Sequence, residues 1–227
     1  MALNGWELRF SGGFSHRTNS VAAYAFSGGD VEAAIVQVEA AYRGQDLKPM
    51  FQVTAAVALP NLAELLTRRG YRATTPSLVC VAEARTVRER CASAIAGEIM
   101  LAPNPDFDAL VVAGSHSEAD GRERLEVLTR IAVPLVRVTV MIEGRGVACG
   151  MAAAADGIAG INLMRTHEGF RRRGLGRRVL GAIAGWSLGE GVETLSLTVE
   201  RDNAPARALY QGVGFEVAYD YLYYVRD

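Results

Sequence analysis

The strongest constraint on this chain is a basic, glycine-containing turn between a predicted strand and a predicted helix. Residues 158–166 predict a buried strand, and residues 175–186 repeat apolar side chains at helical spacing. Between them lies Phe170-Arg-Arg-Arg-Gly-Leu-Gly-Arg-Arg178. A helix N-terminus offers free backbone N–H groups and partial positive charge, and glycines let an anion approach the backbone closely. The arginines add matching cations, so this segment predicts a diphosphate-binding loop.

Two other phosphate-binding loops do not fit this segment. A P-loop requires Lys followed by Ser or Thr after its second glycine, whereas Gly176 is followed by Arg177 and Arg178. A dinucleotide-binding fingerprint requires a third glycine, which is missing here. The spacing Arg-x-x-Gly-x-Gly, over residues 171–176, resembles the pyrophosphate loop of the GNAT superfamily of N-acetyltransferases.

A second pattern follows this loop at the end of the chain. Residues 195–199 alternate like a strand, and Arg201-Asp-Asn203 predicts a turn and a helix N-cap. A short helix over 204–211 has proline in its first turn, Gly212-Val-Gly-Phe215 ends it, and residues 219–225 predict a closing strand. This order resembles the second GNAT signature, which is a strand, then Asn, then Ala-Leu-Tyr, then Gly-Phe. The resemblance covers roughly residues 140–227.

The resemblance implies a mixed α/β (α+β) fold with a central, mostly antiparallel, twisted sheet flanked by helices. Strands are predicted over 135–142 and 147–154, and a polar helix over 118–132. Residues from about 100 to 133 would correspond to the first two helices of the family, which shape the acceptor pocket. The proline-rich part of residues 96–108 predicts a boundary or crossing segment.

The chain also resembles itself at an offset of 144 positions. Residues 51–54 align with 195–198, and residues 70–71 align with 214–215. The apolar stripe of residues 31–42 aligns with that of residues 175–186. These matches at one offset predict an ancient duplication.

The two copies are chemically unequal. The loop aligned with residues 171–176 is Ser27-Gly-Gly-Asp-Val-Glu32, which has no cation and two carboxylates where a diphosphate would lie. Leu66 aligns with Tyr210, and Leu59 aligns with Asn203. We therefore expect residues 1–90 to be a degenerate GNAT-like module without a cofactor site, and residues 91–227 to be the catalytic GNAT domain.

The resemblance also implies roles for individual residues. Tyr210 matches the tyrosine of the family that gives a proton to the departing thiolate. Backbone N–H groups near residues 164–166, on a strand that carries a bulge in the family, would hold the pantetheine arm. No general base is assigned, because Thr198 stands where some members have Glu; Glu168, His167 and Glu200 are candidates by proximity, and a water chain is the alternative. The expected cofactor-binding residues are Met164, Arg165, Thr166, Arg171, Arg172, Arg173, Gly174, Leu175, Gly176, Arg177, Asn203 and Arg207.

The implied function is acetyl-CoA-dependent N-acetyl transfer, by a direct reaction, to a primary amine of a small molecule or peptide. Two alternatives remain open. One is a non-catalytic module that binds acyl-CoA for regulation, and the other is a transferase of a longer acyl chain. The partners expected are therefore acetyl-CoA and an amine, and a homodimer is compatible with these residues.

Composition agrees with a soluble enzyme. Of the 227 residues 50% are hydrophobic, and the formal net charge is −1, which gives no general reason to expect nucleic acid as a partner. No apolar run reaches the ~18–20 residues of a membrane span, and the first residues do not resemble a signal peptide. Three widely spaced cysteines predict reduced thiols and a cytoplasmic location. The three histidines lack metal-ligand spacing, so no metal is expected.

Overall fold

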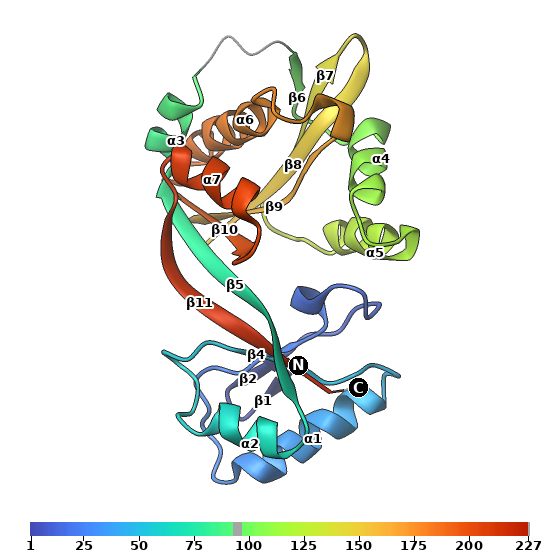
Figure 1. Ribbon diagram of the computed structural model, residues 1–227, viewed down its shortest axis with the longest axis vertical. Helices are drawn as coiled ribbons and strands as arrows, with labels where there is room; N and C mark the ends of the chain where they lie inside the picture. The colour runs from blue at the N-terminus through green and yellow to red at the C-terminus, as the bar shows by residue number, and fades with distance from the viewer. Residues whose placement is uncertain (93–96, 227) are drawn as a thin grey trace. The chain divides into compact units, whose positions relative to one another are not determined.

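The computed structural model describes residues 1–92 and 97–226 and divides into two compact units. Unit 1 consists of Met1–Leu78, Glu200–Asp202 and Tyr219–Asp227, and unit 2 consists of Val79–Val199 and Asn203–Ala218. Strands β5 and β11 contribute residues to both units (Figure 1). Each unit therefore contains the end of a strand that begins in the other, and each is described by itself below.

Unit 2 is a sheet with helices on both faces, in the strand order β5-β10-β9-β8-β7-β6. Parallel pairing joins β9 to β10, and antiparallel pairing joins β6, β7, β8 and β9 in turn. Its elements are β5 (Arg72–Glu83), α3 (Ala84–Arg90), β6 (Glu98–Met100), α4 (Pro105–Ala113), α5 (Glu118–Thr129), β7 (Leu135–Ile142), β8 (Arg145–Ala155), β9 (Ile158–Thr166), η2 (Glu168–Phe170), α6 (Leu175–Gly189), β10 (Thr194–Glu200), α7 (Ala204–Gly212) and the start of β11 (Glu216–Val225).

Alternation along β8 sends its side chains to two different helical layers. Cys149 and Met151 are buried in a cluster with residues of α4 and α5. The intervening Gly150 faces α6, since a Cβ there would lie 2.7 Å from a methyl carbon of Val179. Helices α4 and α5 therefore cover one face of β8 and β9, and α6 covers the other.

Unit 1 is a smaller sheet that packs on α1, with strand order β1-β2-β3-β4-β11-β5. Its buried core contains Trp6, Ile35, Tyr42, Phe51 and Leu66, all at most 1% exposed. Parallel pairing joins β3 to β4, and β11 pairs antiparallel with β4. Its elements are β1 (Ala2–Leu3), β2 (Trp6–Leu8), η1 (His16–Thr18), β3 (Val21–Ala22), α1 (Val31–Arg43), β4 (Met50–Val53), α2 (Leu62–Arg68) and parts of β5 and β11.

Elements of the two halves of the chain begin at the same 144-residue offset that relates their sequences. Helices α1 and α6 begin at Val31 and Leu175, and strands β4 and β10 begin at Met50 and Thr194. Strands β5 and β11 begin at residues 72 and 216. The repeat of elements is therefore a property of the structure, whereas the domain boundaries 1–90 and 91–227 stay a prediction.

The mixed α/β architecture and the mostly antiparallel sheet predicted from the sequence are confirmed. The predicted strand over 158–166 and the helices that start at 175 and 204 are observed at those positions. The proline-rich segment that was predicted as a boundary or crossing segment contains β6 and the start of α4. Asn104 caps α4 by accepting from Phe107 N at 2.9 Å, and proline is compatible with a first helical turn. Residue 96, the first of that region, lies outside the described residues.

Among the described helices, none combines the length and the apolar character that a membrane span requires.

Candidate functional site

The site is centred on two parallel strands of unit 2 that separate along their length. Strands β9 and β10 pair from Ile158 with Thr194 to Ile161 with Leu197, and their ladder ends there. Strand β9 continues to Thr166 while it remains paired with β8 on its other edge. The edge of β9 that faces β10 is therefore unpaired beyond Ile161, and its main-chain polar groups are available to a ligand.

A β-bulge marks the point of separation. Register with β8 shifts between Cys149, which opposes Arg165, and Met151, which opposes Asn162. Gly150 therefore opposes two residues, and one of them, Leu163, has a positive φ of 54°. A side chain at Gly150 has no room, because its Cβ would lie 2.5 Å from Met164 Sδ. A bulge bends the strand and leaves backbone groups outside the ladder, as the sequence resemblance implies.

The turn after β9 presents the N-terminus of α6. Two of its residues, Arg172 at φ 64° and Gly174 at φ 76°, have left-handed backbone conformations. Gly174 is the N-cap of α6, and no side chain caps the helix there. Turns with such backbone conformations direct successive amides toward one point and form concave anion sites. The uncapped amides of α6 and the helix dipole therefore favour an anion at this turn.

A cavity of about 840 Å³ extends along these elements within unit 2. It is bounded by the end of β9, the turn before α6, the first turns of α6 and α7, and the end of α4. The lining residues that the sequence predicts are Met164, Arg165, Thr166, Arg171, Arg172, Gly174, Leu175, Gly176, Arg177 and Asn203. The structure therefore brings these ten residues together around one cavity.

Three predicted residues are not on the cavity lining. Arg173 lies over the ring of Phe170, with its guanidinium carbon 5.0 Å from the ring centroid. Arg207 is exposed on α7. Tyr210 is 9% exposed and packs edge-on against Phe215. Its neighbour Leu209 does line the cavity, so Tyr210 is one residue away from the lining along α7.

The arginines of the turn differ in the number of hydrogen bonds that they form with the rest of the protein. Arg171 is exposed, and its Nε lies 3.5 Å from the carbonyl oxygen of Thr166. Arg172 is exposed and forms no hydrogen bond or ion pair with the other described residues. Arg177, by contrast, donates to the carbonyl oxygens of Arg90 and Gly212 at 3.3 and 3.5 Å. Arg171 and Arg172 are therefore the cations best placed to bind an external anion.

Asn203 fulfils its predicted structural role. Its side-chain oxygen accepts a hydrogen bond from Ala206 N at 3.2 Å, so it is the N-cap of α7. It also lines the cavity. One residue therefore fixes the start of α7 and contributes to the wall of the site.

The candidate bases differ in position and in what they already contact. His167 lines the cavity, but Gly169 N donates to its Nδ1 at 3.3 Å and Arg145 lies 2.9 Å from its Nε2. Both ring nitrogens are therefore engaged. Glu168 is exposed and lines the cavity, whereas Glu200 is outside the lining and belongs to unit 1. Of the three candidates, Glu168 is thus the carboxylate beside the cavity.

The resemblance places the helices that shape the acceptor pocket within residues 100–133, but it names none of the residues of α4 that line the cavity. Leu110, Ala113 and Gly114, at the end of α4, line it. The signal was present in the sequence, because Asn104 and Pro105 are typical of a helix start and apolar residues follow at helical spacing.

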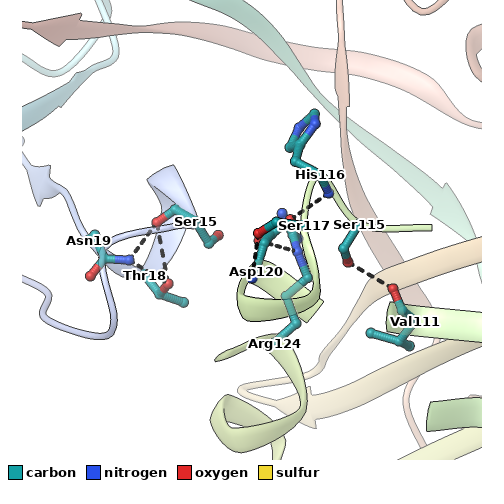
Figure 2. Close-up of polar contacts among 9 residues, drawn as sticks. All are labelled: Ser15, Thr18, Asn19, Val111, Ser115, His116, Ser117, Asp120 and Arg124. Carbon is teal, nitrogen blue, oxygen red and sulfur yellow. Dashed lines mark hydrogen bonds and ion pairs between the residues drawn. The ribbon is translucent and has the colours of Figure 1, made fainter. Parts of the chain in front are cut away.

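The turn between α4 and α5 is held by a buried carboxylate (Figure 2). Asp120 is 2% exposed, accepts from His116 N at 3.1 Å and pairs with Arg124 Nε at 2.8 Å. Burial raises the pKa of Asp120, but the hydrogen bonds from Arg124 and His116 outweigh burial and leave its pKa below the ordinary value. These contacts therefore stabilise the turn above the ordinary Asp pKa, and that contribution is lost as pH falls through the lowered value.

The described residues also bear on the question of a metal site. No group of three or more His, Cys, Asp and Glu side chains among them is arranged to hold a metal ion.

Comparisons with known proteins give a family match and several similar structures. The model of the acetyltransferase (GNAT) family matches residues 97–215. The chain is similar to a GCN5-related N-acetyltransferase from Kribbella flavida, with 18% identity and a TM-score of 0.70 over 91% of this chain and 80% of that chain. It is also similar to a functionally unknown conserved protein from Staphylococcus epidermidis, with 12% identity and a TM-score of 0.72 over 94% and 86%.

A third similar structure is a tandem GNAT protein from the clavulanic acid biosynthesis pathway. Its identity to this chain is 13%, with a TM-score of 0.72 over 90% of this chain and 73% of that chain. At such identities the likeness concerns the fold. No curated protein matches the chain.

Proposed function

The chain belongs to the acetyltransferase (GNAT) family, and on that premise we propose that it transfers an acetyl group from acetyl-CoA directly to a primary amine of a small molecule or peptide. The observation that carries this proposal is the combination of the separated strands β9 and β10 with the uncapped N-terminus of α6. A long, partly anionic co-substrate such as acetyl-CoA fits that combination, because it needs both a strand edge and an anion site.

The residues around the cavity fit the chemistry of the two ends of acetyl-CoA. The amides of the turn before α6, with Arg171 and Arg172, would bind the diphosphate. The unpaired edge of β9 from Met164 to Thr166 would hold the pantetheine arm by main-chain hydrogen bonds. A main-chain N–H of the bulge would polarise the thioester carbonyl, which is the role of an oxyanion hole.

Acetyl-CoA supplies an activated acyl group as a thioester. The nitrogen of the acceptor forms a bond to the acyl carbon, the bond from carbon to sulfur breaks, and the amine loses a proton to water. Tyr210 gives a proton to the thiolate as it departs. Holding amine and thioester together contributes most of the acceleration in this scheme, because no general base is required of the protein.

Direct transfer is favoured over an acyl-cysteine intermediate. Cys149, which opposes Arg165 across the sheet, is fully buried, and burial raises the pKa of its thiol to about 12. A thiol with that pKa is protonated at neutral pH and is a poor nucleophile. Cys80, Cys91 and Cys149 are all free and buried, which supports the proposal of a reducing, cytoplasmic environment.

We also propose that the N-terminal copy, residues 1–90, is a non-catalytic GNAT-like module and that residues 91–227 carry the activity. The side chain of Asp30 accepts from Ala33 N at 3.0 Å at the start of α1, so this helix N-terminus is already capped. The aligned position of Tyr210 is the fully buried Leu66, which has no proton to give.

The test of the proposed function is the Tyr210→Phe variant. The ring and its packing against Phe215 are kept, so acetyl-CoA binding measured by calorimetry should stay within about twofold of wild type. Loss of a general acid costs roughly 100-fold or more in kcat, measured as release of free CoA with a panel of primary amines. Tyr219→Phe, on the exposed Tyr219 of β11, is the matched control and should change neither quantity.

The outcomes separate a transferase from a non-catalytic module. Tight CoA binding without turnover of any amine by the wild type would favour a regulatory acyl-CoA-binding role. Turnover that is equal in wild type and Tyr210→Phe would remove Tyr210 from the mechanism.

A further inference from the structure

Arg165 lines the cavity from the separated part of β9, one residue before the end of the strand. It packs against the end of α4, so closely that a Cβ on Gly114 would lie 2.3 Å from Arg165 Cδ. Glycine is therefore required at 114 for this arginine to take its place. The side chain is half-buried, and its Nε is buried without a hydrogen-bond partner in the described residues.

The protein does not neutralise this cation. Arg165 donates one hydrogen bond, from an Nη to the carbonyl oxygen of Met164 at 3.0 Å, and no carboxylate of the described chain forms an ion pair with it. The carboxylate of α5 that interacts with it electrostatically, Asp120, is already held by Arg124 and His116 N. Burial lowers the pKa of Arg165, and the positive charge of Arg124 lowers it further.

Arg165 lies nearer to the end of the site where the acetyl group would react than to the end where the diphosphate would bind. Arg165 opposes Cys149 in the sheet, touches the end of α4 and interacts electrostatically with Tyr210. The cations that suit the diphosphate, Arg171 and Arg172, belong to the turn before α6. The acetyl end of acetyl-CoA is neutral, so an anion that binds beside Tyr210 has to come from the second substrate.

We propose that the side chain of Arg165 binds a carboxylate of the acceptor, so that the acceptor is an amine that also carries a carboxylate, such as an amino acid or a short peptide. A planar guanidinium presents paired N–H donors that match the two oxygens of a carboxylate. A cation that is partly withdrawn from water and has no opposite charge beside it is energetically unfavourable. A bound carboxylate supplies the missing partner and orients the amine toward the thioester. The main chain of β9 thus serves the co-substrate and the side chain of Arg165 serves the acceptor.

This inference rests on the proposed function, and its test uses pairs of acceptors. Each pair is an α-amino acid, an ω-amino acid or a dipeptide together with its carboxamide, which keeps the amine and removes the negative charge. Charged hydrogen bonds contribute roughly 1.5–3 kcal/mol, so kcat/KM of the wild type should favour the carboxylate by about 10-fold to 100-fold.

Two variants of Arg165 and one control complete the experiment. In Arg165→Gln the preference should fall to about one, through loss on the carboxylates, while CoA affinity stays within about twofold. Arg165→Lys keeps the charge and should retain part of the preference, which preserves the test if the glutamine variant does not fold. Arg122→Gln, on an exposed arginine of α5 that pairs with Glu118, is the matched control and should leave the preference unchanged.

Each other outcome is informative. A wild-type ratio near one, or a ratio that Arg165→Gln leaves intact, overturns the role of Arg165. Tight CoA binding without turnover of any carboxylate-bearing amine in the panel also overturns the role of Arg165. The proposed function is then still tested separately, by the Tyr210→Phe experiment with other primary amines. Failure of the wild type to bind CoA removes the proposed function itself, and this inference with it.

Discussion

The N-termini of α1 and α6 start 144 positions apart, yet only one of them is open to a ligand. Helix α1 begins after Asp30, whose carboxylate accepts from Ala33 N, and Glu32 in its first turn pairs with Arg69 at 2.8 Å. Helix α6 begins after Gly174 without a side-chain cap, and three exposed arginines, Arg171 to Arg173, precede it. A helix N-terminus is thus an anion site only where the chain has not already satisfied it with its own carboxylate.

The strands before these helices differ in a second way. In unit 1 the end of β3 is closed onto β4, with Val21 opposite Phe51 and Ala22 opposite Gln52. In unit 2 the end of β9 has left β10, since their ladder stops at Ile161. Strand ends at aligned positions are therefore paired in one unit and free in the other. A pantetheine arm needs free main-chain groups. The separated strands therefore indicate which unit can bind CoA as clearly as the arginines do.

The largest effect that this comparison predicts is for Arg171→Glu. The variant places a carboxylate beside the uncapped N-terminus of α6 and removes one of the two exposed arginines that line the cavity, so CoA affinity measured by calorimetry should fall by roughly 100-fold. Arg88→Glu, on the exposed surface of α3, makes the same change in net charge and should leave CoA affinity unchanged. Asp30→Asn should also have no effect. Equal effects of Arg171→Glu and Asp30→Asn on CoA affinity would contradict the proposal that residues 91–227 bind CoA and residues 1–90 do not.

A smaller effect is expected in the core of unit 1 for Leu66→Tyr. Leu66 is fully buried at the position aligned with Tyr210. A larger side chain there overpacks the core, so the free energy of unfolding should fall by about 1–3 kcal/mol in urea denaturation. Glu64→Tyr, at an exposed position of α2, should change it by less than about 0.5 kcal/mol. A tolerated tyrosine at 66 would mean that the copies differ less in packing than their sequences indicate.

The smallest effect is expected for Asp30→Ala, which removes the cap of α1. Loss of an N-cap side chain lowers the free energy of unfolding by about 1 kcal/mol, which urea denaturation measures. Asp30→Asn should keep most of the wild-type stability, because the Asn side chain also accepts the hydrogen bond. CoA should bind with the same affinity and stoichiometry as in wild type. Binding of a second CoA by Asp30→Ala would show that an uncapped helix is sufficient and that separated strands are not needed.

The sequence was most informative where local chemistry alone decides the outcome. The glycines and arginines of residues 171–176 predict an anion-binding turn before a helix, and Asn203 and Pro205 predict the start of another helix. The structure has both helix starts, the first without a side-chain cap and the second capped by Asn203. The individual residues of α4 that line the cavity were not named from the sequence, because the proline-rich start of that helix also resembles a boundary between domains. The uncompensated charge of Arg165 was not visible either, since the absence of a partner depends on residues far away in the chain.

The sequence by itself determined that strand, basic turn and helix follow one another in unit 2, and that a weaker copy of the same order precedes them. These features depend on side chains within a few positions of each other. Only the tertiary structure decided which strand ends stay paired, which helix N-terminus stays uncapped, and that the half-buried Arg165 beside the cavity lacks a carboxylate partner in the described residues. Each of these outcomes depends on hydrogen-bond and charge partners that packing brings together from distant parts of the chain.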